Sequence, residues 1–177
     1  MKNKILITGT PRCGKSTLVS KLIDYFIDEK NYIVYGFLTP EVRKDQERVG
    51  FDIIDIYTKK SYQLARVESI KSKYHVGKYN VFIEELDKYL ENFVDIEKKK
   101  INLIIIDEIG KMELYSEKFQ MLIKKLFLSK KSIISTIGKK LQHPLRHFLI
   151  NLPTVELLTL NRQNSQLIFE RVISLIT

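Results

Sequence analysis

GTPRCGKS, residues 9–16, fits the pattern G-x-x-x-x-G-K-[ST] at every position. The apolar run Lys4–Thr8 comes before it and predicts a strand. After it, apolar residues recur at helical spacing from Lys15 to about Glu29 and predict a helix. Because the two glycines of this pattern let the backbone turn tightly, successive N–H groups and the start of the helix can face one anion. The stretch therefore predicts a phosphate-binding loop between a strand and a helix.

The side chains of this loop predict several roles. Lys15 is expected to reach the β- and γ-phosphates of a nucleotide, and the Ser16 hydroxyl to ligate Mg²⁺. Arg12 leaves two interpretations open, a charge added near the phosphates or a side chain directed into solvent. Cys13 lies near the helix start and Lys15, which favours the thiolate, so we expect its alkylation to block nucleotide binding. The loop residues predicted to bind nucleotide are Gly9, Thr10, Pro11, Arg12, Cys13, Gly14, Lys15, Ser16 and Thr17.

A second stretch, IIIDEIGKME at residues 104–113, ends an apolar run on two adjacent acids. In folds with such a loop, the acid that closes a buried strand next to it holds the hydration shell of Mg²⁺, and Asp107 fits that role through water. Glu108 can accept a proton from an attacking water or orient it. The alternative is that Glu108 caps the following helix or pairs with Lys111. Glu113 is interpreted as a first-turn carboxylate of that helix.

Polar residues also lie where later strands are predicted to end. Ser132–Ile137 is expected to be the next strand over, so Ser135 and Thr136 either touch the γ-phosphate or water, or are ordinary strand residues. Arg162 follows the last strand, at the edge where ligands collect in doubly wound sheets. It is interpreted as a nucleotide contact through base stacking or phosphate, or else as a surface arginine at a helix start.

Strands alternate with helices along the chain, which favours an α/β sheet with helices on both faces. The apolar strand Ile101–Ile106 is typical of the centre of a parallel sheet. Extended segments between residues 36 and 66 predict a β-hairpin extension. Helices are expected at 80–94, 114–128, 144–149 and 163–176, and further strands at 132–137 and 155–160. No linker or repeat interrupts this pattern, so residues 1–177 are expected to form a single domain.

The composition narrows the class of protein. With 177 residues and 44% hydrophobic content the chain can bury a substantial core, and no stretch approaches the ~20 apolar residues of a membrane span. The single cysteine fits a reducing compartment, so we expect a soluble, cytoplasmic protein without a membrane partner. The formal charge of +9 allows a nucleic-acid partner but does not favour one, because the lysines are scattered along the whole chain. No sequence feature predicts an oligomeric state.

Several stretches in combination resemble one known family. GFLTPEVRKDQERVGFDIIDI at 36–56, VGKYNV at 76–81, IIIDEIGKME at 104–113 and NR at 161–162 follow the phosphate loop. Their order is that of the small P-loop nucleoside-triphosphatases of the thermophilic or cancer-related type, and the resemblance covers nearly the whole chain. It implies a mostly parallel sheet of the P-loop NTPase fold, in the RecA and AAA+ branch. It also implies Mg²⁺-dependent hydrolysis of ATP and other nucleoside triphosphates, with Glu108 as the catalytic base.

Two positions depart from the family pattern. Similar proteins tend to carry glycine where Arg12 stands, and glycine near the Asp45-Gln46 turn. The first departure could alter the conformation of the loop or its phosphate contacts. The second is expected to change only the tip of a hairpin, because Asp tolerates turn conformations.

Three functions are consistent with these features. The leading hypothesis is a nucleoside triphosphatase in which Lys15 and Mg²⁺ stabilise the developing charge and Glu108 positions water. The transition-state arginine would be Arg43, Arg48 or Arg162, with no basis in the sequence for choosing among them. The second hypothesis is a small nucleotide or nucleoside kinase, because GTPRCGKST also resembles the loops of small kinases and a basic lid could contain Lys139, Lys140 and Arg146. The third is a nucleic-acid-binding ATP switch, motivated by the charge alone.

Overall fold

The computed structural model describes residues 3–67, 72–96 and 98–177. Its strands are β1 Lys4–Gly9, β2 Val34–Leu38, β3 Glu41–Lys44, β4 Glu47–Asp55, β5 Ser61–Arg66, β6 Tyr74–Val76, β7 Tyr79–Val81, β8 Leu103–Ile109, β9 Ser132–Gly138 and β10 Val155–Leu160. Its α-helices are α1 Lys15–Asp24, α2 Ile83–Leu90, α3 Glu117–Leu128, α4 Pro144–Ile150 and α5 Ser165–Ile176. A π-helical turn, η1 Tyr25–Glu29, extends α1, and two short 3-10 helices are η2 Glu91–Phe93 and η3 Glu113–Tyr115.

All the strands of the described residues belong to one mixed sheet. The strand order is β10-β1-β9-β8-β2-β4-β5-β7-β6, with β3 paired to β4. The pairs from β10 to β2 are parallel, and the pairs beyond β2 are antiparallel. The predicted class, an α/β fold with a mostly parallel core, is therefore confirmed.

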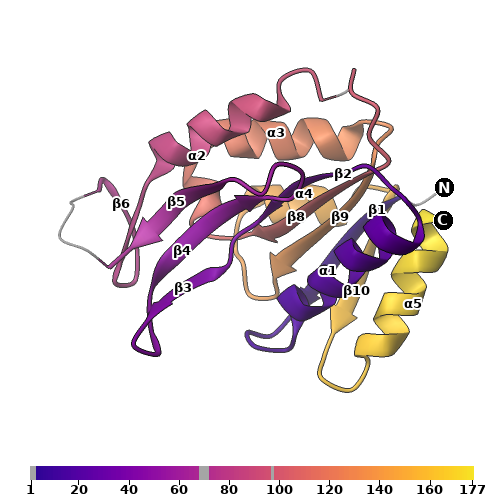
Figure 1. Ribbon diagram of the computed structural model, residues 1–177, viewed down its shortest axis with the longest axis horizontal. Helices are drawn as coiled ribbons and strands as arrows, with labels where there is room; N and C mark the ends of the chain where they lie inside the picture. Colours follow the sequence, from indigo (N-terminus) through magenta and orange to yellow (C-terminus); the bar gives the residue numbers. More distant parts are fainter. Residues whose placement is uncertain (1–2, 68–71, 97) are drawn as a thin grey trace.

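Helices cover both faces of the parallel core (Figure 1). Along β1, Ile5 and Ile7 pack into the cluster that contains α1 and α5, while Leu6 packs into the cluster that contains α2, α3 and α4. Successive side chains of a strand point to opposite faces, so one apolar run supplies both cores. None of the helices in the described parts of the chain is long and apolar enough to cross a lipid bilayer.

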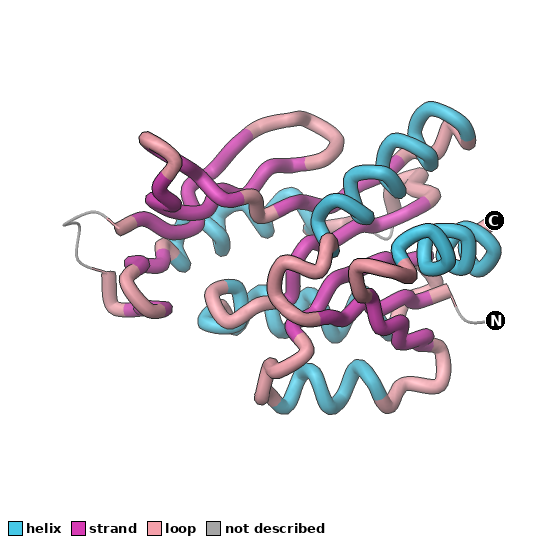
Figure 2. Tube along the Cα trace, turned by 90° about the horizontal axis from the view of Figure 1, so that it is seen from below, coloured by secondary structure: helices cyan, strands magenta, loops and turns pink. Residues whose placement is uncertain are grey.

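The antiparallel part of the sheet is larger than the predicted hairpin at 36–66. It continues through β6 and β7 to Val81 and extends from one side of the parallel core (Figure 2). The helix predicted at 80–94 was therefore wrong at its start, since Asn80 and Val81 belong to β7 and α2 begins at Ile83. Tyr79 and Val81 are buried and Asn80 between them is half-buried, an alternation that the helical spacing of later residues concealed.

The order of the central strands also differs from the prediction. We expected the acidic strand beside the phosphate-loop strand and Ser132–Ile137 as the next strand over, but β9 lies between β1 and β8. Parallel strands need crossover helices, and nothing in a local apolar pattern states which neighbour a crossover reaches. The carboxyl ends of these parallel strands still meet at one edge, where the phosphate loop and the acids come together.

Candidate functional site

Gly9 of the phosphate loop is required by its neighbours, and Gly14 by its own backbone conformation. A Cβ at Gly9 would lie 2.6 Å from the Leu160 carbonyl oxygen and 2.5 Å from Cys13 Sγ. Gly14 precedes α1 with φ 100°, a left-handed conformation that side chains rarely adopt. The loop therefore keeps its shape because both positions lack a side chain.

Arg12 matches one of its two interpretations, a side chain directed into solvent, whereas Cys13 is buried. Arg12 has φ 62°, so a non-glycine residue occupies the left-handed conformation at the position where similar proteins tend to carry glycine. Its side chain is exposed. Cys13 is only 6% exposed and packs with the apolar residues beneath the loop, including Ile5 and Ile7. This burial leaves the thiol less open to alkylation than we expected, and the block of nucleotide binding by alkylation stays a prediction.

Lys15 and the start of α1 form an open cationic end. Lys15 is the first residue of α1, and its Nζ lies 3.5 Å from the Gly9 carbonyl oxygen, across the base of the loop. No side chain caps this helix end, so its first N–H groups are available to an anion. Ser16 and Thr17 follow in the first turn and are exposed, as are Thr10 and Pro11 in the loop.

Asp107 lies near the end of β8, where the pairing with β9 changes register. Asp107 and Glu108 fall between the paired positions Ile106 and Ile109 of β8, opposite the single residue Thr136 of β9. The Thr136 hydroxyl donates to one carboxylate oxygen of Asp107, and the Ser135 hydroxyl donates to the Ile106 carbonyl at 2.9 Å. Both hydroxyls are buried and hold β8, rather than facing a phosphate.

Glu108 is partly buried and charged groups surround it. Burial raises the pKa of its carboxyl, the neighbouring Asp107 raises it further, and the positive charge of Lys15 opposes both effects. The capping alternative is not what the structure has, because Ser116 caps the next α-helix by accepting the Phe119 N–H at 2.9 Å. A carboxylate with a raised pKa next to a lysine is typical of a catalytic site.

Glu113 is the site residue that the sequence interpretation missed. It is 3% exposed, and burial together with the charge of Glu108 raises its pKa to about 8, against the effect of nearby backbone N–H groups. Both carboxyl groups lie over Gly110, where a Cβ would be 2.7 Å from Glu113 Oε2 and 3.0 Å from Glu108 Oε1. The sequence did carry one sign that Glu113 is buried, because this acid stands between two apolar residues, Met112 and Leu114.

Ser16 and Asp107 have the chemistry to hold a divalent cation. They offer a hydroxyl and a carboxylate, the hard oxygen donors that Mg²⁺ prefers. Ser16 is exposed in the first turn of α1, and one carboxylate oxygen of Asp107 is oriented by Thr136. The residues present therefore fit Mg²⁺.

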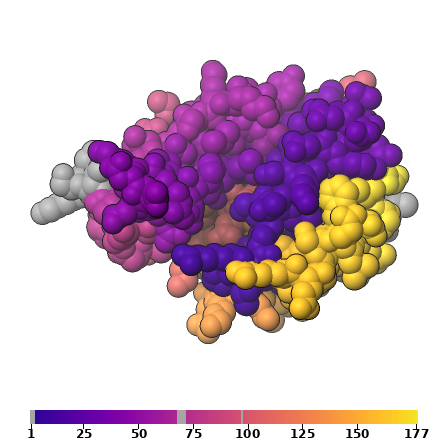
Figure 3. Space-filling view, turned by 60° about the horizontal axis from the view of Figure 1, so that its bottom comes forward, coloured from indigo at the N-terminus to yellow at the C-terminus, as the bar shows by residue number. Residues whose placement is uncertain are grey.

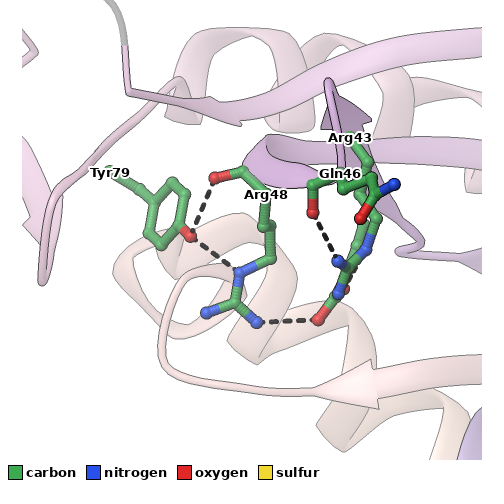
Figure 4. A network of polar contacts seen from close by, with 5 residues as sticks. Arg43, Gln46, Arg48 and Tyr79 are labelled. Carbon is green, nitrogen blue, oxygen red and sulfur yellow. Dashed lines mark hydrogen bonds and ion pairs between the residues drawn. The ribbon is translucent and has the colours of Figure 1, made fainter.

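Arg43 and Arg48 lie together on the β3–β4 hairpin (Figure 4). Glu41 bridges them, with ion pairs of 2.7 Å to each guanidinium. Arg48 also donates to the Tyr79 hydroxyl at 2.7 Å and lies over the rings of Phe51 and Tyr79. Both arginines are thus held by a network within the antiparallel part of the sheet.

Arg162 lies on the other side of the phosphate loop. It follows β10, whose residue Leu160 is the register partner of Gly9 in β1, and its side chain is exposed. Figure 3 shows a hollow between the violet β3–β4 hairpin and the indigo N-terminal region, with the yellow C-terminal segment beside the indigo atoms.

Comparisons with known proteins agree with this architecture. A family model described as NTPase matches residues 4–173. Nucleoside-triphosphatase THEP1 of Thermotoga sp. (strain RQ2) is 38% identical over 173 residues, which cover 98% of this chain and 95% of that protein. THEP1 of Methanocaldococcus jannaschii is 36% identical over 171 residues, covering 97% of this chain and 95% of that protein.

Two solved structures are also similar. The crystal structure of THEP1 from Aquifex aeolicus has a TM-score of 0.83 at 35% identity, covering 98% of both chains. The solution structure of a human cancer-related nucleoside triphosphatase has a TM-score of 0.75 at 25% identity, covering 99% of this chain and 97% of that one. With the phosphate loop, the acidic strand end and the fold in agreement, the chain belongs to the NTPase family that includes the THEP1 nucleoside-triphosphatases.

Proposed function

We propose that this chain is a Mg²⁺-dependent nucleoside triphosphatase that converts ATP and other nucleoside triphosphates to the diphosphate and phosphate. The names of its relatives support nucleoside triphosphates as the substrate class. The observation that carries the proposal is the position of Glu108, a partly buried carboxylate near the carboxyl end of β8, at the same edge of the parallel sheet as the phosphate loop that follows β1.

In this proposal each residue has one chemical role. The loop backbone from Gly9 to Ser16 and the α1 N-terminus bind the phosphates, and Lys15 neutralises charge at the β- and γ-phosphates. Glu108 accepts one proton from water as the water oxygen bonds to the γ-phosphorus and the bond from that phosphorus to the bridging oxygen breaks. Ser16 and Asp107 would hold Mg²⁺, which when bound supplies further charge neutralisation. Thr17 and Arg162 are proposed as further nucleotide contacts.

The test of the reaction is a phosphate-release assay over the four common ribonucleoside triphosphates. Each is supplied with Mg²⁺ or with chelator, and with no acceptor molecule present. We expect release from several nucleotides with Mg²⁺ and a large loss with chelator. Formation of the nucleoside diphosphate only after a nucleotide or nucleoside acceptor is added, with the phosphoryl group on the acceptor and no free phosphate, would identify a kinase and reject the proposal. A parallel series with RNA or DNA measures whether nucleic acid changes the rate.

The test of the base is Glu108→Gln. The carboxamide keeps the shape of the side chain but cannot accept the proton, so kcat should fall on the order of 10²–10⁴-fold, the usual contribution of a general base. Nucleotide binding, measured directly, should persist. Glu117→Gln is the matched control, because Glu117 is an exposed acid of the α3 first turn. Retention of near-normal turnover by Glu108→Gln would exclude Glu108 as the base.

A further inference from the structure

Thr39 holds the peptide that joins Asp107 to Glu108. Its backbone N–H donates to the Asp107 carbonyl at 2.6 Å, and its hydroxyl donates to the same carbonyl at 2.9 Å. The Glu108 N–H in turn donates to the Thr39 hydroxyl at 3.2 Å. A hydroxyl can donate one hydrogen bond and accept others, so this one side chain satisfies both polar groups of a single peptide.

These contacts lie where the regular ladders of β8 end. The parallel pairing of β2 with β8 stops at Leu38 and Asp107, one residue before Thr39 and Glu108. On the other side, the pairing of β8 with β9 is irregular between Ile106 and Ile109. Glu108 therefore projects from a segment outside both regular ladders, and irregular segments of this kind aim side chains in directions that a regular strand does not allow.

The two acids are held by residues in or next to the two strands that flank β8. Thr136, from β9, donates to the Asp107 carboxylate, whereas Thr39, from the end of β2, holds the backbone of Glu108. In the described part of the chain, the Thr39 hydroxyl makes no hydrogen bond to the Glu108 carboxyl group, so its effect on that group passes through the backbone.

We propose that Thr39 is a positioning residue for hydrolysis, whose hydroxyl fixes the backbone direction from which the Glu108 carboxylate reaches the attacking water. This inference rests on the proposed function, in which Glu108 is the base. Geometry of this kind matters because displacements of about 1 Å at a reacting group can cost on the order of 10²-fold in rate.

Two substitutions separate positioning from a general effect on the fold. Thr39→Val keeps the branched shape but removes the hydroxyl, and Thr39→Ser keeps the hydroxyl but removes the methyl group. We expect Thr39→Val to lower kcat roughly 10- to 100-fold, with the nucleotide dissociation constant unchanged. Thr39→Ser should restore turnover. Thr58→Val is the matched control, because the Thr58 hydroxyl also donates within a turn, to Asp55 at 2.9 Å, away from the acid pair.

A double variant with Glu108→Gln completes the test. If Thr39 acts through Glu108, Thr39→Val should not slow the Glu108→Gln protein further, because residues that work as a unit are not additive. Thr39→Val with normal kcat, beside an inactive Glu108→Gln, would overturn the positioning role and leave the base assignment intact. The positioning role is also overturned if Thr39→Val lowers kcat by the same factor in the unmodified protein and in the Glu108→Gln protein. Normal turnover of Glu108→Gln alone would instead remove the proposed base.

Discussion

Gly110 provides the space in which the Glu108 and Glu113 carboxyl groups meet. A Cβ at this position would approach Glu113 Oε2 to 2.7 Å and Glu108 Oε1 to 3.0 Å, so Gly110→Ala must displace one or both side-chain ends. Because these are flexible ends, the free energy of unfolding should change little, while kcat should fall about 10²-fold through misplacement of the base. Steady-state phosphate release and urea unfolding of the same variant check both expectations.

Gly138→Ala is the control for this substitution. It lies at the end of β9, on the same edge of the sheet, but a Cβ there would meet only Leu141 Cβ at 3.7 Å, an ordinary contact. Equal loss of kcat in both variants would show that the effect is not specific to the carboxyl groups over Gly110.

At the scale of single residues, local sequence patterns predicted a residue's role best where that role depends on the conformation of the backbone. The phosphate loop could be identified because its glycines and lysine stand at fixed spacing in the sequence. Glu113 and Thr39 could not be identified in this way. Glu113 becomes unusual only through burial beside Glu108, and Thr39 only through contacts with residues 68 and 69 positions later in the chain. Both properties depend on which strands become neighbours.

The β3–β4 hairpin offers a test at the scale of one element. β3 ends at Lys44 and β4 begins at Glu47, and the two residues of the turn, Asp45 and Gln46, have φ values of 48° and 65°. Two-residue turns with both φ values positive favour glycine, especially at the second position. Gln46→Gly should therefore raise the free energy of unfolding by roughly 0.5–1 kcal/mol, the relief of left-handed strain less the added chain entropy.

Urea unfolding of Gln46→Gly and Asp45→Gly measures this effect. Asp tolerates the left-handed conformation better than Gln, so Asp45→Gly should gain less. The Arg43 contact to the Gln46 carbonyl, 2.9 Å long, uses only the backbone and remains available in the glycine variant. A loss of stability in Gln46→Gly would mean that the Gln46 side chain contributes more than its backbone strain costs.

The order of the strands could not be predicted from local sequence patterns. The apolar runs of β1, β8 and β9 are alike, since all three are buried on both faces. Their order depends on where each crossover helix returns the chain. The three-residue strands β6 and β7 were missed for another reason, because segments this short carry too few positions to distinguish a strand from a helix start.

At the scale of the whole molecule, the buried Glu113 makes stability depend on pH. Its pKa is about 8 in the folded protein, against an ordinary value of 4.5. Between these values the folded state keeps a proton that the unfolded chain releases, so the free energy of unfolding falls as pH rises through this window. Glu113→Gln removes the titration, and its stability relative to the unmodified protein should therefore increase from pH 5 to pH 8.

Urea unfolding of the nucleotide-free protein in chelator, at one-unit steps of pH, measures this difference. Glu117→Gln, at an exposed acid, is the control for removing a carboxylate from the surface. Parallel curves for Glu113→Gln and the unmodified protein would show that Glu113 titrates alike in the folded and unfolded states.

The placement of β1 between β9 and β10 has a consequence for protein synthesis. The strand that carries the phosphate loop is made first, yet both of its sheet partners come from residues 132–138 and 155–160. During synthesis, β1 therefore has no strand to pair with until most of the chain has left the ribosome. The nucleotide site is consequently among the last parts of the molecule to be completed, and a nascent chain that stops before β9 has no partner strand for β1, which carries the phosphate loop.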